Sequence, residues 1–170
     1  MSYATDSIHA ACTAQATIAT PLGKMLLART ADGVAGVWFE GQKDHPGTLT
    51  APERPDDPLL RRVATQLTDY FAGRNANFDL PLDLRGTAFQ RDVWRALLRI
   101  GAGTTCSYGE IAKQLGSPQA VRAVGAAVGK NPVSVIVPCH RVIGSGGALT
   151  GYAGGMERKR ALLTLEGVHV

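Results

Sequence analysis

The chain has 170 residues, of which 45% are hydrophobic and 19% are charged, a composition typical of a globular protein with one domain or two small ones. No stretch approaches the ~20 apolar residues of a transmembrane helix, and no signal peptide is expected. The three cysteines, Cys12, Cys106 and Cys139, are odd in number and scattered. Neither a disulfide framework nor a structural zinc site is therefore expected, and the reducing cytoplasm is the expected compartment.

The net charge of +4 divides unevenly along the chain. Residues 1–84 carry 7 Lys or Arg and 10 Asp or Glu, a balance of −3, whereas residues 85–170 carry 11 and 4, a balance of +7. A basic half beside an acidic half indicates a polyanionic partner for the basic half, most often nucleic acid. A solvated basic surface is the other interpretation of the charge alone.

The first half of the chain predicts a tail and a small α+β domain. Residues 1–16, rich in Ala, Thr and Ser, are expected to form a flexible tail. Three short apolar runs separated by turn residues predict strands. They lie at residues 17–20, 25–28 and 34–39. After a proline-rich loop, apolar residues at helical spacing predict a helix from Pro58 to Gly73. Residues 17–84 are thus the predicted N-terminal domain, without a catalytic cluster.

The second half, residues 85–170, predicts a helical domain with two capping boxes. Thr87 with Gln90, and Ser107 with Glu110, have the residue types and spacing in which side chain and backbone cap a helix N-terminus reciprocally. Each pair therefore marks the start of a helix.

A third helix is predicted to begin with Ser117 as its N-cap and Pro118 in its first position, and to end before Asn131-Pro132. Together with the short helix before it, across a tight turn at Gly116, it forms a helix-turn-helix pattern.

The main chemical signal is Pro138-Cys-His-Arg141, which follows the apolar run Val133-Ser-Val-Ile-Val137. That run predicts a strand that presents Cys139 at its end, followed by His140. Cysteine is a strong nucleophile, and histidine is the commonest base that activates it. Alternatively, Cys139 is an inert core residue, since free cysteine is often buried. Because neighbouring strand residues face opposite ways, an interaction between the two side chains requires a bridging water or a bend at Pro138.

The predicted helix over residues 119–129 has an apolar face and a face of small residues. The valines expected to pack inward are Val121, Val124 and Val128. The opposite face carries Gln119, Arg122, Ala123 and Ala126. This face has too few polar side chains to read base edges in the major groove, whereas small residues suit close approach to the minor groove. Arg122 is the candidate to fill the gap left by a flipped base. A helix packed between two others is the alternative.

Glu166 lies in the predicted last turn of the final helix, before Gly167 as the C-cap. An acidic side chain there opposes the helix dipole, and a residue that breaks a local rule often marks a functional site. Glu166 is therefore a candidate to orient His140 in a Cys-His-acid relay. An exposed surface glutamate is the alternative.

Together these residues resemble the O6-alkylguanine-DNA alkyltransferases, also called methylated-DNA–protein-cysteine methyltransferases. The matching segments, in order across residues 86–167, are Phe89-Gln90, Val93-Trp94, Ser107-Tyr-Gly-Glu-Ile-Ala112, Arg122-Ala-Val-Gly125, Asn131-Pro132, Ile136-Val-Pro-Cys-His-Arg-Val-Ile143, Thr150-Gly-Tyr-Ala-Gly-Gly155 and Leu162-Leu-Thr-Leu-Glu-Gly167. The N-terminal half matches only loosely. The resemblance implies an α+β fold, in which a small RNase H-like domain precedes a winged helix-turn-helix-like catalytic domain.

The resemblance also implies a function and its residues. Members of this family flip O6-alkylguanine, with O4-alkylthymine as a second candidate substrate, and transfer the alkyl group to a cysteine once, without turnover. By motif position, Cys139 would accept the alkyl group, His140 would activate it through water, and Glu166 would orient His140. Tyr108 would donate a proton to the leaving guanine, and Arg122 would replace the flipped nucleotide. The remaining structural and pocket residues implied by the resemblance are Asn131, Val142, Tyr152 and Ala153.

No cofactor is expected, because DNA itself supplies the alkyl group. No metal is expected either, since only His9 and Cys12 stand where some relatives bind zinc. The expected partner is double-stranded DNA, bound by a monomer through the minor groove with little sequence specificity; no membrane is expected.

Three rival hypotheses stay open. A non-catalytic protein that binds alkylated DNA would lack the acceptor cysteine, and a cysteine hydrolase would need an oxyanion hole. A winged-helix regulator that senses oxidants would need a helix better suited to reading bases.

Overall fold

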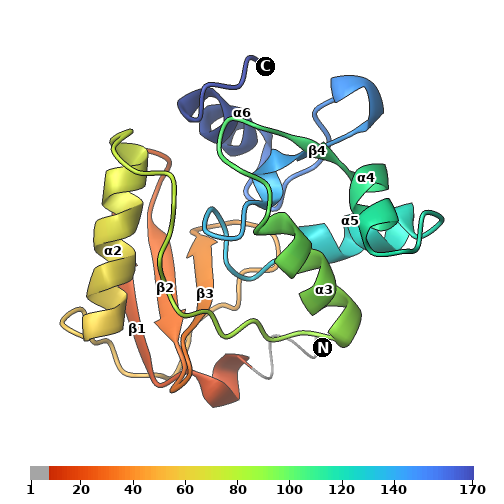
Figure 1. Ribbon diagram of the computed structural model, residues 1–170. Helices are drawn as coiled ribbons and strands as arrows, with labels where there is room; N and C mark the ends of the chain where they lie inside the picture. Colours follow the sequence, from red (N-terminus) through yellow and green to blue (C-terminus); the bar gives the residue numbers. More distant parts are fainter. Residues whose placement is uncertain (1–7) are drawn as a thin grey trace. The chain divides into compact units, whose positions relative to one another are not determined.

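In the computed structural model, which describes residues 8–170, the chain forms two compact units that divide after Gly86. Figure 1 shows their elements, and each unit is described by itself. Among residues 8–170, no helix is both long and apolar enough to cross a membrane.

The first unit is built on a three-stranded antiparallel sheet in the order β1-β2-β3. Its strands are β1 (Ala14–Ile18), β2 (Met25–Arg29) and β3 (Val34–Phe39). Ile18 at the end of β1 pairs with Met25 at the start of β2, beside the turn that joins these two strands. On the opposite edge of β2, Met25 also pairs with Phe39 of β3. Gly23, in the turn between β1 and β2, has a φ of 115°, a conformation that glycine adopts without steric cost. Every residue of β3 is buried, so the third strand lies in the core of this unit.

Helix α2 (Pro58–Phe71) covers the sheet and packs against β1 and β2 (Figure 1). It begins after Asp57, whose carboxylate accepts a hydrogen bond of 3.0 Å from the backbone N–H of Leu60, with Pro58 in the first turn. Its buried side chains recur at helical spacing: Leu59, Leu60, Val63, Leu67 and Tyr70. The predicted helix is therefore present, and it is amphipathic for the reason the sequence indicates.

The predicted tail is wrong for residues 8–16. Residues 8–11 are helical, Ile8 belongs to a buried apolar cluster, and β1 begins at Ala14. Ala14 and Ala16 are buried and pair with β2, so these small residues belong to a half-buried strand. The abundance of Ala, Thr and Ser suggests a tail, but it does not show that alternate residues of this segment are buried. The rest of the predicted tail, residues 1–7, lies outside the described residues.

The second unit contains three helices that pack together: α3 (Ala88–Leu97), α4 (Tyr108–Gln114) and α5 (Val121–Gly129). The capping box at Thr87 is confirmed, because its hydroxyl accepts from the Gln90 N–H at 3.1 Å and the Gln90 side chain accepts from the Thr87 N–H at 3.0 Å. The second predicted capping box is present in one half only: Ser107 caps α4 by accepting from the Glu110 N–H at 3.1 Å, whereas the Glu110 carboxylate lies 3.6 Å from the Cys106 Sγ. Fully buried Trp94 donates its indole N–H to the Ala127 carbonyl at 2.8 Å, which ties α3 to α5.

A short parallel ribbon and a last helix complete this unit. Strand β4 (Cys106–Ser107) pairs with β5 (Val142–Ile143), and a 3₁₀ helix (Cys139–Arg141) leads into β5. A glycine-rich loop then connects β5 to α6 (Met156–Leu165). A helix-turn-helix followed by a ribbon and loop makes the unit winged helix-like, and the chain as a whole is α+β, as predicted.

The start of α5 differs from the prediction. Ser117 is not its N-cap: the Ala120 N–H donates to the Ser117 carbonyl at 2.9 Å in a turn, and α5 begins only at Val121. Proline is as favourable in the second position of a turn as in the first position of a helix, so Ser117-Pro118 suits both. Val121 is the first residue of α5 and is 40% exposed, so its predicted inward packing is wrong, whereas Val124 and Val128 are buried as predicted.

The predicted strand over residues 133–137 is also wrong. Val135 has a φ of 71°, which is unusual for a β-branched residue, and the chain closes through a hydrogen bond of 3.0 Å from the Val137 N–H to the Val133 carbonyl. Asn131 competes for the same backbone: its side chain accepts from the Val133 N–H at 2.9 Å and donates to the Val137 carbonyl at 2.8 Å. The Val133 and Val137 backbone groups are therefore hydrogen-bonded within this segment and to Asn131, not to a neighbouring strand. The run is apolar because its residues are buried, not because it forms a strand.

Candidate active site

Cys139 begins the 3₁₀ helix that replaces the predicted end of a strand. Its side chain is buried, with 5% of the residue exposed. The turn is closed by a hydrogen bond of 2.8 Å from the Cys139 N–H to the Val137 carbonyl and one of 3.0 Å from the Arg141 N–H to the Pro138 carbonyl. This tight turn supplies the bend at Pro138 that an interaction between Cys139 and His140 requires.

His140 is paired with Glu166 inside the second unit. The imidazole Nε2 lies 2.7 Å from the Glu166 Oε2, and the two side chains are 0% and 1% exposed. Since a carboxylate only accepts hydrogen bonds, Nε2 carries the proton and Nδ1 keeps its lone pair. Nδ1 is buried and makes no hydrogen bond with any group of residues 8–170. The imidazole is therefore oriented by one nitrogen and able to accept a proton at the other.

Glu166 is held by a second partner, Arg141, which sequence reasoning did not assign. The Arg141 Nε donates to Glu166 Oε1 at 2.7 Å and its Nη2 donates to Oε2 at 3.0 Å, while Nη1 donates to the Ile100 carbonyl at 2.5 Å. Such a bidentate pair compensates the buried carboxylate charge. The C-cap of α6 is Glu166 and not Gly167 as predicted; Gly167 follows it with a φ of 87°. Because the Glu166 side chain is only 1% exposed, the exposed-glutamate alternative is wrong.

Lys159 is a second site residue that sequence reasoning missed. It is fully buried in α6, and its ammonium donates to the Val142 carbonyl at 2.6 Å and to the Thr150 carbonyl at 3.2 Å. The available signal was its position three and four residues before Leu162 and Leu163, which places all three on one helix face. A lysine on an apolar face needs polar partners, and these come from β5 and from the loop between β5 and α6.

Charges around the sulfur oppose the effect of burial. Burial raises the pKa of the Cys139 thiol, whereas hydrogen bonding from Asn131, the Lys159 ammonium and hydrogen bonding from Tyr152 lower it. Burial lowers the pKa of Lys159, and the Cys139 sulfur opposes that shift. The site therefore favours a thiolate more than an apolar pocket of the same depth would.

Burial also keeps the imidazole neutral. It lowers the pKa of His140, although the hydrogen bond and charge of Glu166 raise it, and the Arg141 and Lys159 cations lower it further. A neutral imidazole has a nitrogen that can accept a proton, as a general base requires.

Tyr108 and the other predicted pocket residues come from three elements. Tyr108 is the first residue of α4; its ring lies beside Gly125 of α5, where an added Cβ would be 3.8 Å from the tyrosine Cδ1, and its hydroxyl is 2.8 Å from the Thr150 Oγ1. Val142 is fully buried in β5, and Tyr152 and Ala153 are half-buried in the loop before α6.

The predicted DNA-facing residues lie on a separate surface of the same unit. Its members, all exposed, are Gln119, Arg122, Ala123 and Ala126. Gln119 lies in the turn before α5, and the other three lie on α5 itself. Two of these four exposed residues are alanines, and one is an arginine.

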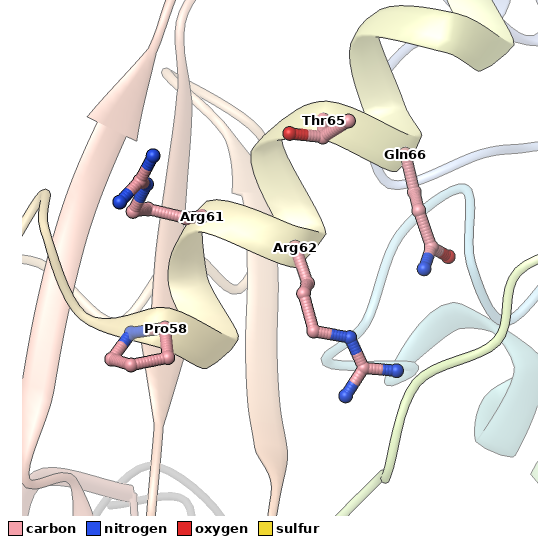
Figure 2. Close-up of a pocket in the computed structure, with 5 residues that line it drawn as sticks. All are labelled: Pro58, Arg61, Arg62, Thr65 and Gln66. Carbon is pink, nitrogen blue, oxygen red and sulfur yellow. The ribbon is translucent and has the colours of Figure 1, made fainter.

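Two surface hollows are not lined by Cys139, His140 or Glu166. One, with a volume of about 460 Å³, is on the outer face of α2 (Figure 2). Arg62 and Gln66 beside it both donate to the Asp79 carbonyl, at 2.7 and 3.0 Å. Since side chains of a single helix line this hollow and none is a cysteine, histidine or carboxylate, it is not the candidate site. The second, of about 310 Å³, lies between β4 and the glycine-rich loop and is lined by Cys106 and Glu110 among others.

The winged helix-like unit defines a class of protein: a DNA-binding architecture that contains a buried cysteine, followed in sequence by a histidine whose imidazole is paired with a carboxylate. Two family models match the chain. The "6-O-methylguanine DNA methyltransferase, ribonuclease-like domain" covers residues 14–84, and the "6-O-methylguanine DNA methyltransferase, DNA binding domain" covers residues 88–168. The chain belongs to the 6-O-methylguanine DNA methyltransferase family.

Individual relatives agree with this assignment. A methylated-DNA–protein-cysteine methyltransferase of Mycobacterium bovis is 51% identical over 150 residues, which cover 88% of this chain and 90% of the relative. One from Methanosarcina acetivorans is 46% identical over 151 residues, with 87% and 94% covered. The crystal structure of Mycobacterium tuberculosis OGT in complex with DNA superposes with a TM-score of 0.82 at 49% identity, covering 90% of this chain and 92% of that one.

Proposed function

We propose that this protein repairs DNA by transferring the alkyl group of O6-alkylguanine to Cys139, once per molecule. The observation that carries the proposal is the buried Cys139 with His140 as the next residue, whose imidazole is hydrogen-bonded to Glu166 at 2.7 Å. Membership of the family and relatives named for methyl transfer to a protein cysteine support it. The Cys139 residue distinguishes this chain from a protein that only binds alkylated DNA.

The proposed reaction is a single displacement. The Cys139 thiol passes its proton through a water molecule to Nδ1 of His140, and the thiolate attacks the alkyl carbon. The S–C bond forms as the C–O6 bond breaks, and the electron pair of that bond stays with the guanine. Tyr108 donates a proton to a ring nitrogen of the leaving guanine and regains one from the imidazolium through solvent. The thioether that forms is not hydrolysed, so the protein is consumed.

The relay supplies what an isolated buried thiol lacks. An ordinary cysteine of pKa ~8.5 is only about 3% thiolate at pH 7, and burial reduces that fraction further. The Glu166 carboxylate stabilises the imidazolium formed when His140 accepts the proton, and Arg141 holds that carboxylate in place through its two hydrogen bonds. The Lys159 ammonium favours the thiolate electrostatically.

We assign DNA binding to residues 85–170, whose net charge of +7 suits phosphate contacts. The exposed small-residue face of α5 would approach the minor groove, with little sequence specificity, and Arg122 would occupy the space of the flipped nucleotide. Val142, Tyr152 and Ala153 would form the wall of the base pocket. O4-alkylthymine is the second candidate substrate, and the protein would act as a monomer.

The decisive experiment uses the full chain and a DNA duplex that contains one O6-methylguanine. After incubation, mass spectrometry of the Cys139 peptide should show one methyl group in place of the thiol hydrogen. The same duplex with unmodified guanine, and the Cys139→Ala protein, should give no gain. If the wild-type peptide gains no methyl group although the protein binds the duplex, the non-catalytic binding hypothesis replaces this proposal.

A further inference from the structure

The Thr150 side chain lies between the pocket wall and Tyr108. Its Oγ1 is 2.8 Å from the Tyr108 hydroxyl, across 42 residues of sequence. Either oxygen can be the donor in this pair. The choice matters, because the Tyr108 proton is the one that the proposed reaction delivers to the guanine.

Thr150 itself is held from two other directions. Its carbonyl accepts a hydrogen bond from the buried Lys159 ammonium at 3.2 Å. Its methyl group lies against Gly144, where an added Cβ would be 3.1 Å from the threonine Cγ2. A β-branched side chain has few χ1 options, so a fixed backbone and a packed methyl group also fix where the hydroxyl lies. Thr150 is thus a rigid partner for Tyr108.

The Tyr108 ring is fixed as well, because it starts α4 and lies beside Gly125 of α5. A rigid ring and a rigid threonine leave one main freedom, which is the rotation of the two hydroxyl protons. If Tyr108 donates to Thr150, its proton points away from a bound base. If Thr150 donates to Tyr108, the tyrosine proton is directed to a different acceptor, and the hydrogen bond it receives makes the tyrosine a stronger donor.

We propose that Thr150 is a positioning residue for alkyl transfer: its hydroxyl donates to the Tyr108 oxygen and thereby directs the tyrosine proton to the leaving guanine. Thr150 keeps its own proton throughout and touches no reacting atom. The inference rests on the proposed function and goes beyond it, because it assigns the donor in the Tyr108–Thr150 pair. It also gives Lys159 a second task, which is to anchor the Thr150 backbone.

The test is a double-mutant cycle on single-turnover methyl transfer with the O6-methylguanine duplex. Thr150→Val keeps the branched shape and removes the hydroxyl; it should slow transfer about 10-fold, the effect of one hydrogen bond to a group that changes charge. Thr150→Ser keeps the hydroxyl and should retain most of the rate. DNA affinity, measured by fluorescence anisotropy, should be the same for both variants. Thr150→Ala is the second hydroxyl-free variant should the valine protein be unfolded.

The Tyr108→Phe background separates positioning from packing. There, Thr150→Val should cause no further loss, because the hydroxyl it removes has lost its partner. An equal loss in both backgrounds, or a serine variant as slow as the valine variant, would overturn the inference. A wild-type protein that does not methylate Cys139 at all would overturn the proposed function instead, so the two failures are distinguishable.

Discussion

Cys139 and Cys106 are both buried in the second unit, yet the charges around their sulfur atoms have opposite signs. Cys106 Sγ lies 3.6 Å from Glu110 Oε2; burial, and then the Glu110 carboxylate, raise the pKa of Cys106 to about 11. Burial raises the pKa of Cys139 too, but there the neighbours are Asn131 and the Lys159 ammonium, which lower it. Burial alone makes a thiol inert, and the local charge and a base decide which thiol is a nucleophile.

The largest expected effect is the loss of the nucleophile itself. Cys139→Ser should abolish methyl transfer to the protein, because a serine hydroxyl without full deprotonation does not displace an alkyl group from guanine. Cys106→Ser should transfer at close to the wild-type rate, since Glu110 and burial disfavour the Cys106 thiolate. Single-turnover transfer from the O6-methylguanine duplex measures both. A comparable loss of methyl transfer in Cys106→Ser would contradict the assignment of Cys139, and not Cys106, as the nucleophile.

Glu166→Gln tests the relay on the Cys139 side. The neutral amide no longer stabilises a protonated His140 and leaves the Arg141 guanidinium buried without a charge partner. We expect methyl transfer to fall about 100-fold, in the range of general-base effects, and the free energy of unfolding to fall by about 3 kcal/mol. Rapid-quench kinetics and urea denaturation measure the two effects.

The matched control is Glu157→Gln, which removes an exposed carboxylate from the same helix, α6. It should leave rate and stability near wild type. A Glu166→Gln protein as stable as this control would show that the buried pair contributes little.

Lys159→Met removes the cation that distinguishes the two thiols. Because the ammonium lowers the pKa of Cys139, its loss should raise that pKa, and the rate–pH profile should move to higher pH. Transfer should be about 10-fold slower at pH 7, which corresponds to a Cys139 pKa higher by about one, and the difference should narrow only as the pH approaches that raised pKa. Arg160→Met, an exposed neighbour, is the control. The same apparent pKa in the profiles of Lys159→Met and wild type would exclude an electrostatic role.

The smallest expected effect comes from the Cys106 side. Glu110→Gln removes the carboxylate that raises the pKa of Cys106, so that pKa should fall towards the ordinary value and the thiolate fraction at a given pH should rise. In a Cys139→Ser background, iodoacetamide should alkylate Cys106 a few-fold faster, because burial still opposes the thiolate. An unchanged alkylation rate would assign the inertness of Cys106 to burial alone.

Local signals predicted much of the fold. The capping residues Thr87 and Ser107, the Pro58 helix start and the apolar runs at β2 and β3 are present as expected, since each depends on contacts within a few residues. The errors at Ser117 and at residues 133–137 also have a local origin, because two local arrangements there share one sequence pattern. There, a proline turn and the Asn131 side chain satisfy the backbone in a way that resembles a helix start or a strand in sequence.

Sequence alone was sufficient to identify the family motifs, the Cys139–His140 pair and Glu166 as the candidate third member, because nucleophile and base are neighbours and the glutamate breaks a helix rule. Packing decided the rest. Only tertiary structure buries the Lys159 ammonium against the Val142 carbonyl, pairs Arg141 with Glu166 and brings the Thr150 hydroxyl to Tyr108. Those contacts join residues between 17 and 42 positions apart. The free energy of a buried charge depends on such distant partners, which no short window of sequence contains.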